Sequence, residues 1–337
     1  MFNQAKVKRV PSQQHLGVIL DAKLNFNEHL KIMINKLTKG ISMLRKLRYY
    51  IPRHSLITIY KSFIRSHTDF ADVIYDQPHN NTIINKLESI QYNSALAITG
   101  AIRGTSREKL YQELGLEYLS SRRWFKRLSL FHKIIHSKSP YYLHNIIPKP
   151  NHLINTRYQY LIPNFFCRTL SFTNSFFPYS IKERNKLDRS LTSNNSLSSF
   201  RNTLLKSIRP TPNRVYGACD PHGLILLTRL RVGLSHLRKH KFKHGFNDTI
   251  NPLCPCNMEV ESTTHFYLHC QNFVTQRLDL MNEIFTLEPN LQDLDEMSLT
   301  NVLLFGSKEF GSELNTKILN LSIAFILCTK RFEEPLF

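Results

Sequence analysis

The chain is poor in acidic residues and in cysteine. Asp and Glu together number 25 against 45 Lys and Arg, so the formal net charge is +20 over 337 residues. A surplus of this size predicts a polyanionic partner, most simply nucleic acid, with an anionic membrane surface less favoured. Six cysteines do not suggest a disulfide framework, and Cys167, Cys219 and Cys328 stand singly. This pattern fits reduced thiols in a protein of the nucleus or cytoplasm.

Long hydrophobic runs are also missing. The longest apolar stretch, from Ile318 to Cys328, contains Asn320 and Ser322 and is far shorter than a membrane span. The first ten residues are polar and basic, without the apolar core of a signal peptide. Apolar residues still make up 42% of the chain, with 22 Phe and 14 Tyr, which predicts folded structure. We therefore expect a soluble, folded protein with no membrane partner.

Catalytic motifs are absent as well. The chain has no Walker loop, no G-x-S-x-G elbow, no H-E-x-x-H and no H-x-E deaminase signature. Phe70-Ala71-Asp72-Val73 approaches an F/Y-x-D-D box, but Val73 stands at the second aspartate position. Two-metal phosphoryl transfer needs several convergent carboxylates. We therefore predict no active site here, and we expect Asp69, Asp72 and Asp76 at helix ends and in loops.

One cluster of residues does indicate a chemistry. Cys254 and Cys256 are separated by one residue, and His265 and Cys270 complete a C-x-C-x8-H-x4-C array. Three thiolates and one imidazole suit a closed tetrahedral zinc site, which leaves no position for a reactive water. We therefore predict a structural zinc site at Cys254, Cys256, His265 and Cys270. His269 is an alternative to His265, although its adjacency to Cys270 makes simultaneous ligation awkward.

A basic segment leads into this array, with no acidic residue between Gly223 and Asn247. We predict a helix from Gly223 to Phe242 whose charges contact phosphates and whose aromatic residues stack on bases. The alternative is an ordinary solvated helix face. The predicted nucleic-acid contacts are Arg229, Arg231, Arg238, Lys239, Lys241, Phe242 and Lys243. A weaker basic run spans Arg122 to Arg127, where we expect Trp124 and Phe125 in a core and the charges exposed.

The hydrophobic pattern predicts a mainly α fold in three parts. Residues 1–145 form a helical bundle after a strand-like stretch from His15 to Asp21, and the first helix carries apolar residues three and four apart with lysines on its solvent face. Residues 146–212 form an irregular connector with short strands and a helical segment near Ser198 to Ile208. Residues 213–337 contain the basic helix, the small zinc module at 254–270 and C-terminal helices separated by a loop with Asp293, Asp295 and Glu296. The remaining expected helices are His54–Ser66, Thr82–Ile98, a short one after a Thr105/Glu108 capping box that ends near Gly115, Ser120–Ile135, Val274–Phe285 and Leu314–Cys328.

Several short stretches, taken in order, resemble a known family. His15-Leu16-Gly17-Val18-Ile19-Leu20-Asp21, with Leu24-Asn25-Phe26, is similar to the "LG" box that ends the palm and begins the thumb of non-LTR, LINE/jockey-like retrotransposon reverse transcriptases. Other similar segments include the motifs Leu44-Arg45-Lys46-Leu47, Ile59-Tyr60-Lys61-Ser62-Phe63-Ile64 and Leu87-Glu88-Ser89-Ile90-Gln91-Tyr92-Asn93, followed by Ile98-Thr99-Gly100, Arg229-Leu230-Arg231 and the terminal Cys/His array. The chain thus resembles the C-terminal part of such an RNA-directed DNA polymerase, with residues 1–145 as the end of the palm and the thumb-like bundle.

This resemblance implies binding without catalysis. In the family the polymerising aspartates lie upstream of the LG box, which only 14 residues precede here. The resemblance therefore implies no catalytic residues, magnesium only if a palm is supplied elsewhere, and as partners RNA or DNA and the missing palm and endonuclease portion. A freestanding zinc-dependent RNA- or DNA-binding protein derived from such an element is the alternative. An enzyme whose palm acts in trans, or belongs to a longer reading frame, is a third hypothesis.

Overall fold

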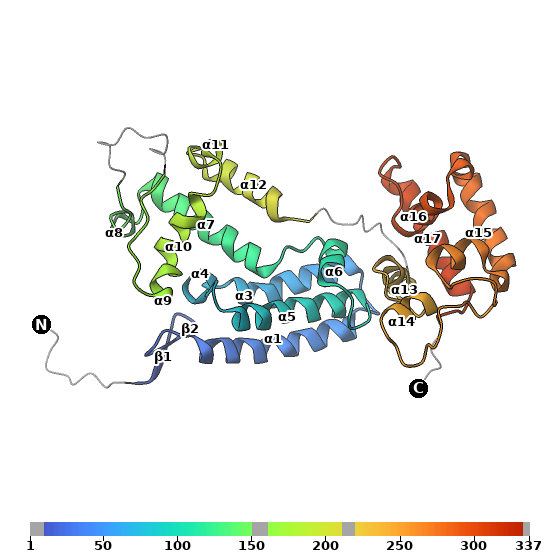
Figure 1. The fold of residues 1–337 in the computed structure, drawn as a ribbon, viewed down its shortest axis with the longest axis horizontal. Helices are drawn as coiled ribbons and strands as arrows, with labels where there is room; N and C mark the ends of the chain where they lie inside the picture. The colour runs from blue at the N-terminus through green and yellow to red at the C-terminus, as the bar shows by residue number, and fades with distance from the viewer. Residues whose placement is uncertain (1–9, 150–160, 211–219, 333–337) are drawn as a thin grey trace, which may run out of the picture. The chain divides into compact units, whose positions relative to one another are not determined.

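The structure is a computed structural model that describes residues 10–149, 161–210 and 220–332 (Figure 1). It is mainly helical, as predicted, and a two-stranded hairpin is the sheet found in those residues. No helix among them is long and apolar enough to cross a membrane. The longer helices are α1 (Asn27–Leu47), α2 (Arg53–Ile59), α5 (Asn81–Thr99), α6 (Arg107–Leu114), α7 (Leu119–Ser137), α10 (Phe176–Arg184), α12 (Leu197–Ile208), α13 (Pro221–Arg231), α15 (Val274–Leu287), α16 (Glu296–Phe305) and α17 (Ser312–Cys328).

The N-terminal hairpin divides the stretch that was predicted as one strand. β1 (Ser12–His15) pairs antiparallel with β2 (Val18–Asp21), and His15 lies opposite Val18. Leu16 and Gly17 join the strands with φ angles of 45° and 85°. Two consecutive positive φ values are the geometry of a type I′ turn, which matches the twist of a tight hairpin. The LG pair is therefore a turn rather than the interior of a strand.

Two compact units share the chain, and each draws on alternating stretches of it. The three parts predicted from the sequence are contiguous, whereas these units are interleaved. Unit 1 consists of Met1–Gly40, Lys61–Gln91 and Glu117–Arg209, and unit 2 of Ile41–Tyr60, Tyr92–Leu116 and Pro210–Phe337.

In unit 1, helix α7 packs against α10, α12 and the short helix α4 (Asp72–Tyr75). Phe125 and Leu128 of α7 bury against Phe200 and Leu204 of α12, each at most 3% exposed. These residues recur at helical spacing, so one face of α7 is removed from water. The prediction that Phe125 lies in a core is correct.

The predicted irregular connector is more helical than expected. Its described residues contain α10, α12, α9 (Leu170–Thr173) and α11 (Arg189–Thr192), and no strand is found among residues 146–149 and 161–210. The expected short strands are thus not present in the part that the structure describes. The Asn, Phe and Pro content of this stretch predicts turns rather than helices. The short helices form because tertiary packing stabilises them, which local sequence does not show.

In unit 2, helix α17 contacts α13, α15 and α16, and these four helices contribute to one apolar core. Leu227, Leu303 and Ile318 are completely buried there. The predicted C-terminal loop with three acidic residues is shorter than expected: Asp293 ends the 3-10 helix η4 (Pro289–Asp293), Asp295 lies between the helices, and Glu296 begins α16. The carboxylate of Asp295 accepts hydrogen bonds from the backbone N–H groups of Met297 and Ser298, both at 3.1 Å, and so caps α16.

The predicted capping box ahead of α6 does not form. Ser106, not Thr105, is the N-cap residue, and its side chain accepts no capping hydrogen bond. The hydroxyl of Thr105 donates instead to the carbonyl of Ile102 at 2.7 Å. The end of this helix is as predicted, because Gly115 adopts the left-handed conformation at φ 62°.

A buried ionic triad joins three helices of unit 2. Oε1 of Glu113 in α6 accepts from Nη1 of Arg53 in α2 and from Nη1 of Arg231 in α13, both at 2.9 Å. The three side chains are 3%, 0% and 1% exposed for Arg53, Glu113 and Arg231. A single carboxylate therefore holds two guanidinium groups in the interior.

Candidate metal centre and basic surface

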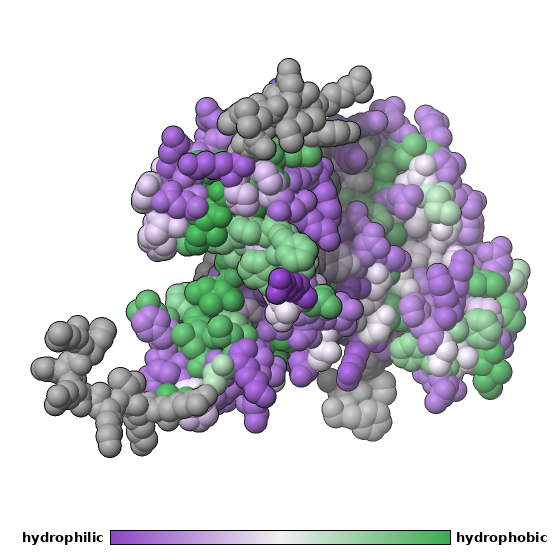
Figure 2. Space-filling model, turned by 60° about the vertical axis from the view of Figure 1, so that its left-hand side comes forward, coloured by the Kyte–Doolittle hydropathy of each residue, from purple (hydrophilic) through white to green (hydrophobic). Residues whose placement is uncertain are grey.

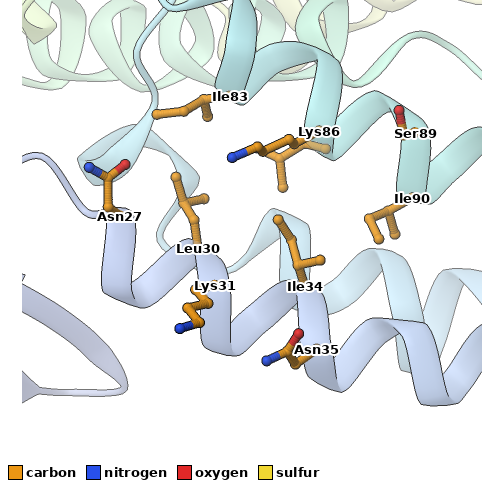
Figure 3. Close-up of a pocket in the computed structure, with 10 residues that line it drawn as sticks. Asn27, Leu30, Lys31, Ile34, Asn35, Ile83, Lys86, Ser89 and Ile90 are labelled. Carbon is orange, nitrogen blue, oxygen red and sulfur yellow. The ribbon is translucent and has the colours of Figure 1, made fainter.

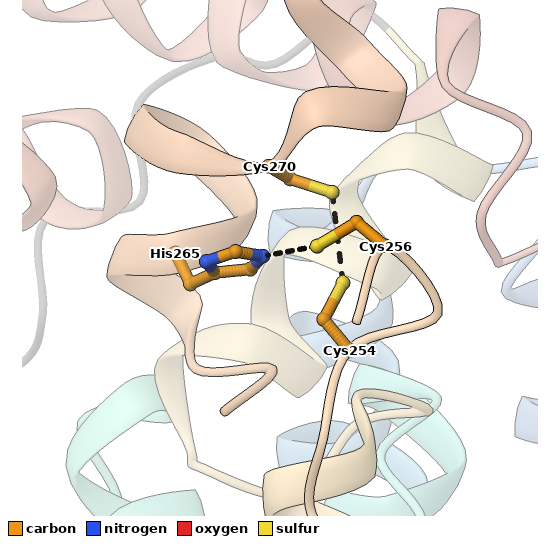
Figure 4. A group of neighbouring side chains, drawn as sticks. All are labelled: Cys254, Cys256, His265 and Cys270. Carbon is orange, nitrogen blue, oxygen red and sulfur yellow. Dashed lines mark hydrogen bonds between the residues drawn. The ribbon is translucent and has the colours of Figure 1, made fainter. Parts of the chain in front are cut away.

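A tight turn positions the first two predicted metal ligands. The backbone N–H of Cys254 donates to the carbonyl of Glu259, and the N–H of Asn257 donates to the carbonyl of Cys254, both at 2.8 Å. Asn257 has a φ of 61°, a left-handed conformation that asparagine tolerates. This turn presents the side chains of Cys254 and Cys256 toward the same point (Figure 4).

A π-helical turn positions the other two. Residues His265–His269 form η2, and the N–H of Cys270 donates to the carbonyl of His265 at 2.8 Å. Such i→i+5 turns are rare and often occur at functional sites. The wider turn lets His265 and Cys270, five residues apart, point toward the same side (Figure 4).

The four side chains converge on one point. Their ligand atoms all lie within 4.8 Å of one another. Sγ of Cys254 lies 3.6 Å from Sγ of Cys270, and Sγ of Cys256 lies 3.3 Å from Nε2 of His265. Cys254, His265 and Cys270 are buried, and Cys256 is half-buried. This group can hold a metal ion, and no other cluster of potential metal ligands is found in the described part of the chain.

The thiols would release their protons to solvent when a metal cation binds. Burial raises the pKa of Cys254 to about 12 and also raises the pKa of Cys270. Burial acts the same way on Cys256, but the backbone N–H of Met258 and the adjoining Cys254 and His265 outweigh it and lower its pKa to about 6. Metal ligation requires thiolates, and burial disfavours their negative charge. A cation at this point would offset that cost.

A carboxylate orients the imidazole of His265. Nδ1 of His265 lies 3.2 Å from Oε2 of Glu259, so Nε2 is directed at the cysteines. Nε2 of His269 lies 3.1 Å from Oε2 of Glu296 instead, and the structure does not place His269 in the cluster. Glu259 was missed in the sequence, where nothing marks it apart from its position between Cys256 and His265.

A second missed residue, Glu261, links the metal-bearing turn to the basic segment. Its buried carboxylate accepts from the backbone N–H of Arg238 at 2.6 Å. The same carboxylate accepts from Nε and Nη2 of Arg331 at 2.6 and 2.8 Å. Bidentate pairs of this kind are strong and directional. The first turn of the short helix α14 (Arg238–Lys243) is therefore fixed to the residues that follow the cysteine turn.

The basic segment is two helices rather than the single predicted one. Helix α13 ends at Arg231, and α14 begins at Arg238. Gly233, at φ 73°, lies between them and reverses the backbone, a role that glycine commonly takes after a helix. The sequence did not indicate this break, because basic residues continue through both helices without an acidic residue between them.

Arg231 is a correction to the predicted nucleic-acid contacts. Arg231 is only 8% exposed. Its Nη1 pairs with Glu113, and its Nε donates to the carbonyl of Leu304. A charge that holds two interior groups is not available to a phosphate. Its burial depends on Glu113, which lies 118 residues earlier in the chain.

The other predicted contacts lie at or near the surface. Lys239, Phe242 and Lys243 of α14 are exposed. Lys241 is half-buried and paired with Asp248, and the guanidinium Nη1 of Arg238 donates to the carbonyl of Leu253 at 3.2 Å. Arg229 is also half-buried, and its Nε donates to the carbonyl of Gly100 at 2.9 Å.

No family model, curated protein or solved structure matches this chain. The function is therefore inferred from the metal centre, the surface charge and the placement of the remaining acidic groups.

The acidic residues around Phe70-Ala71-Asp72-Val73 are neutralised by α7. Asp69 accepts three hydrogen bonds from the guanidinium of Arg122: Nε donates to Oδ1 at 2.8 Å and to Oδ2 at 2.9 Å, and Nη2 donates to Oδ2 at 2.8 Å. Asp72 pairs with Lys126 at 3.0 Å. These aspartates lie at helix ends, as predicted.

The same pairing corrects the expectation that the basic run of α7 is an exposed face. Arg127 pairs with Asp76 at 2.9 Å, and its side chain is 2% exposed. Arg123 is also buried. The basic side chains of this run are buried or half-buried because Asp69, Asp72 and Asp76, about 50 residues earlier, pack against α7.

A cavity lies in unit 1 between α1 and α5 (Figure 3). Its volume is about 740 Å³, and Leu30, Ile34, Ile83 and Ile90 supply much of its wall. The residues that line it include no histidine, cysteine or carboxylate. Green patches also interrupt the polar surface elsewhere on the face drawn in Figure 2. Lys31, Lys86 and Ser89 lie in the lining of the cavity, but no histidine or carboxylate lies beside them there to activate a nucleophile.

Proposed function

We propose that this chain binds RNA or DNA through the exposed face of α14, which a structural zinc site holds in place. The observation that carries the proposal is the connection through Glu261. That carboxylate fixes the N-terminal turn of α14 to the segment between the cysteine turn and His265. A metal-stabilised module therefore presents Lys239, Phe242 and Lys243 to solvent.

Zinc is supported by donor type and spacing. A tetrahedral zinc ion with Zn–S bonds of about 2.3 Å separates two sulfurs by about 3.8 Å. The 3.6 Å between Cys254 and Cys270 and the 3.3 Å between Cys256 and His265 are close to such tetrahedral edges. Three thiolates and one imidazole favour zinc over the oxygen-seeking magnesium and calcium. With four protein ligands, the ion would stabilise the fold and would not activate a water.

Nucleic acid is supported by the excess of positive charge and by its position. The chain carries +20, and the exposed lysines of α14 are accompanied by an exposed aromatic ring. Lysine ammonium groups bind backbone phosphates with little sequence preference, and an aromatic face stacks on unpaired bases. Phe242 is 50% exposed, which leaves a ring face available for stacking.

The resemblance to non-LTR retrotransposon reverse transcriptases gives this binding its biological setting. We infer that the chain corresponds to the thumb and terminal Cys/His region, which would hold template RNA or target DNA for a polymerase. The paired state of Asp69 and Asp72 supports the inference that these aspartates do not hold catalytic magnesium. Magnesium and polymerisation would require a palm supplied elsewhere, in the nucleus or the cytoplasm.

Salt dependence of binding tests the proposal. Fluorescence anisotropy of labelled single-stranded RNA and duplex DNA, titrated with the full chain between about 50 and 200 mM salt, should show affinity falling steeply as salt rises. Lys239→Gln with Lys243→Gln should reduce the slope of log affinity against log salt for duplex DNA by about 1.8, or about 0.9 for each lost phosphate contact.

The matched control removes two exposed lysines elsewhere in unit 2, Lys308→Gln with Lys317→Gln. It changes net charge equally and should leave the slope near that of the wild type. An affinity independent of salt, or equal slopes for the two double variants, would refute the proposed role of α14.

A further inference from the structure

A small basic cavity lies beside α14, within unit 2. Its volume is about 220 Å³, and it is formed by the N-terminal end of α6, the turn after α13 and one side of α14. The five basic residues that line it are Lys109, Lys239, His240, Lys243 and His244. Thr105 and Ser106 add hydroxyl groups, and no carboxylate contributes to the lining. Basic side chains from two separate chain segments, α6 and α14, therefore converge with no acidic group among them.

Lys109 is exposed, but a hydrogen bond holds its ammonium group in position. Its Nζ donates to the carbonyl of Val232 at 3.1 Å. It also lies close over Gly233, where an added Cβ would come within 3.2 Å of Nζ. An ammonium group has three donors, and one carbonyl uses only one of them. The turn thus places a pre-oriented charge with donor capacity at the cavity.

The lowered pKa of His240 reflects both its burial and the positive charges around it. Its Nδ1 lies 2.8 Å from Oγ of Ser235. Burial, which is the largest cause, and the nearby charges of His244, Lys239, Lys109 and Lys243 together lower the pKa of His240 to about 4. No acidic group opposes them. An anion in the cavity would be stabilised by this same concentration of charge.

The size of the cavity limits the ligand. Small-molecule sites in proteins usually measure about 300–1,000 Å³, so about 220 Å³ suits a compact group. We propose that this cavity binds one phosphate group of a nucleic-acid strand, through the ammonium groups of Lys109, Lys239 and Lys243 and the hydroxyl of Ser106. This deepens the proposed function, on which it rests for the source of the phosphate. It adds a fixed phosphate position to the α14 surface.

Inorganic phosphate tests the cavity without a nucleic acid. Isothermal titration calorimetry of the full, zinc-loaded chain should detect phosphate binding that the double variant Lys109→Gln with Lys239→Gln weakens at least about tenfold, as expected for the loss of about 1.4 kcal/mol. Lys308→Gln with Lys317→Gln, with the same charge change outside the cavity, should stay within about twofold of the wild type. Circular dichroism spectra that match the wild type would show that both double variants are folded. Absence of phosphate binding, or an equal effect of the two double variants, would overturn the proposal.

Oligonucleotides identify the source of the phosphate. If 5′-phosphorylated RNA binds more tightly than 5′-hydroxyl RNA, and the cavity variant removes the difference, the site takes a terminal phosphate. If the variant weakens both equally, the site takes a backbone phosphate. Failure of the proposed function looks different, because the chain would then bind inorganic phosphate through the cavity but would bind neither RNA nor DNA.

Discussion

Neutralising Glu113 should destabilise unit 2 more than any comparable surface substitution. In Glu113→Gln, the two guanidinium groups that now lie 2.9 Å from one carboxylate oxygen lose their only counter-charge in the triad. An exposed ion pair contributes about 0–1 kcal/mol, because water screens it. These side chains are at most 3% exposed, and removing one partner of a buried pair costs about 3–5 kcal/mol. We expect a loss of that size in the free energy of unfolding.

Two measurements would establish this loss. Urea denaturation followed by far-ultraviolet circular dichroism gives the global effect, and hydrogen exchange with mass spectrometry of peptides from α6 and α13 gives the local opening free energy. Glu108→Gln, an exposed residue of the same helix, is the matched control and should change stability by less than about 0.5 kcal/mol. If the two variants lose the same stability, Glu113 does not hold the triad and the argument for its burial energy is wrong.

Three further predictions concern the metal, a histidine and a glycine. Cys270→Ser should lose bound zinc, measured by atomic emission, and should unfold the surrounding turn, whereas Cys328→Ser, at an exposed thiol outside the cluster, should keep a full equivalent of zinc. Burial lowers the pKa of His132 to about 4, below the value of about 6.5 for the unfolded chain, so the unfolded state binds more protons between these values. Stability should therefore be complete above pH 6.5 and fall as the pH drops toward 4, and His132→Phe should flatten that part of the urea midpoint profile; an unchanged profile would contradict the assignment. Gly100→Ala should cost about 2–4 kcal/mol, because Gly100 has a φ of 66° and an added Cβ would lie 2.7 Å from the side chain of Ile225; a cost below about 1 kcal/mol in urea denaturation would show that this contact relaxes freely.

The parts of the fold that were predictable are those that local pattern determines. The apolar residues of α1, three and four apart, are buried from Leu30 to Leu44, except for half-buried Ile34, and the lysines between them are exposed. Helix α5 was expected from Thr82 to Ile98 and spans Asn81–Thr99. The four residues predicted to bind metal come together because all lie within a short stretch of chain, where spacing alone constrains geometry.

The features that were missed depend on partners far along the chain. In the sequence, Arg231 is one more basic residue of the same segment as the exposed lysines of α14. Only its contact with Glu113 distinguishes it from them. The charges of α7 were expected at the surface because Asp69 and Asp72 lie about 50 residues away. Sequence periodicity contains no information about such pairs, since it describes neighbours on one element only.

The position of Arg331 has a consequence for processing of the protein. Its guanidinium donates two hydrogen bonds to the carboxylate of Glu261. A protease that trims the C-terminus past this residue would leave the Glu261 carboxylate buried without its main partner, next to the first turn of α14. Loss of Arg331 would thus loosen the attachment of α14 without changing a lysine of that helix or a metal ligand. Intact mass is therefore as important as zinc content when a preparation of the protein is tested for nucleic-acid binding.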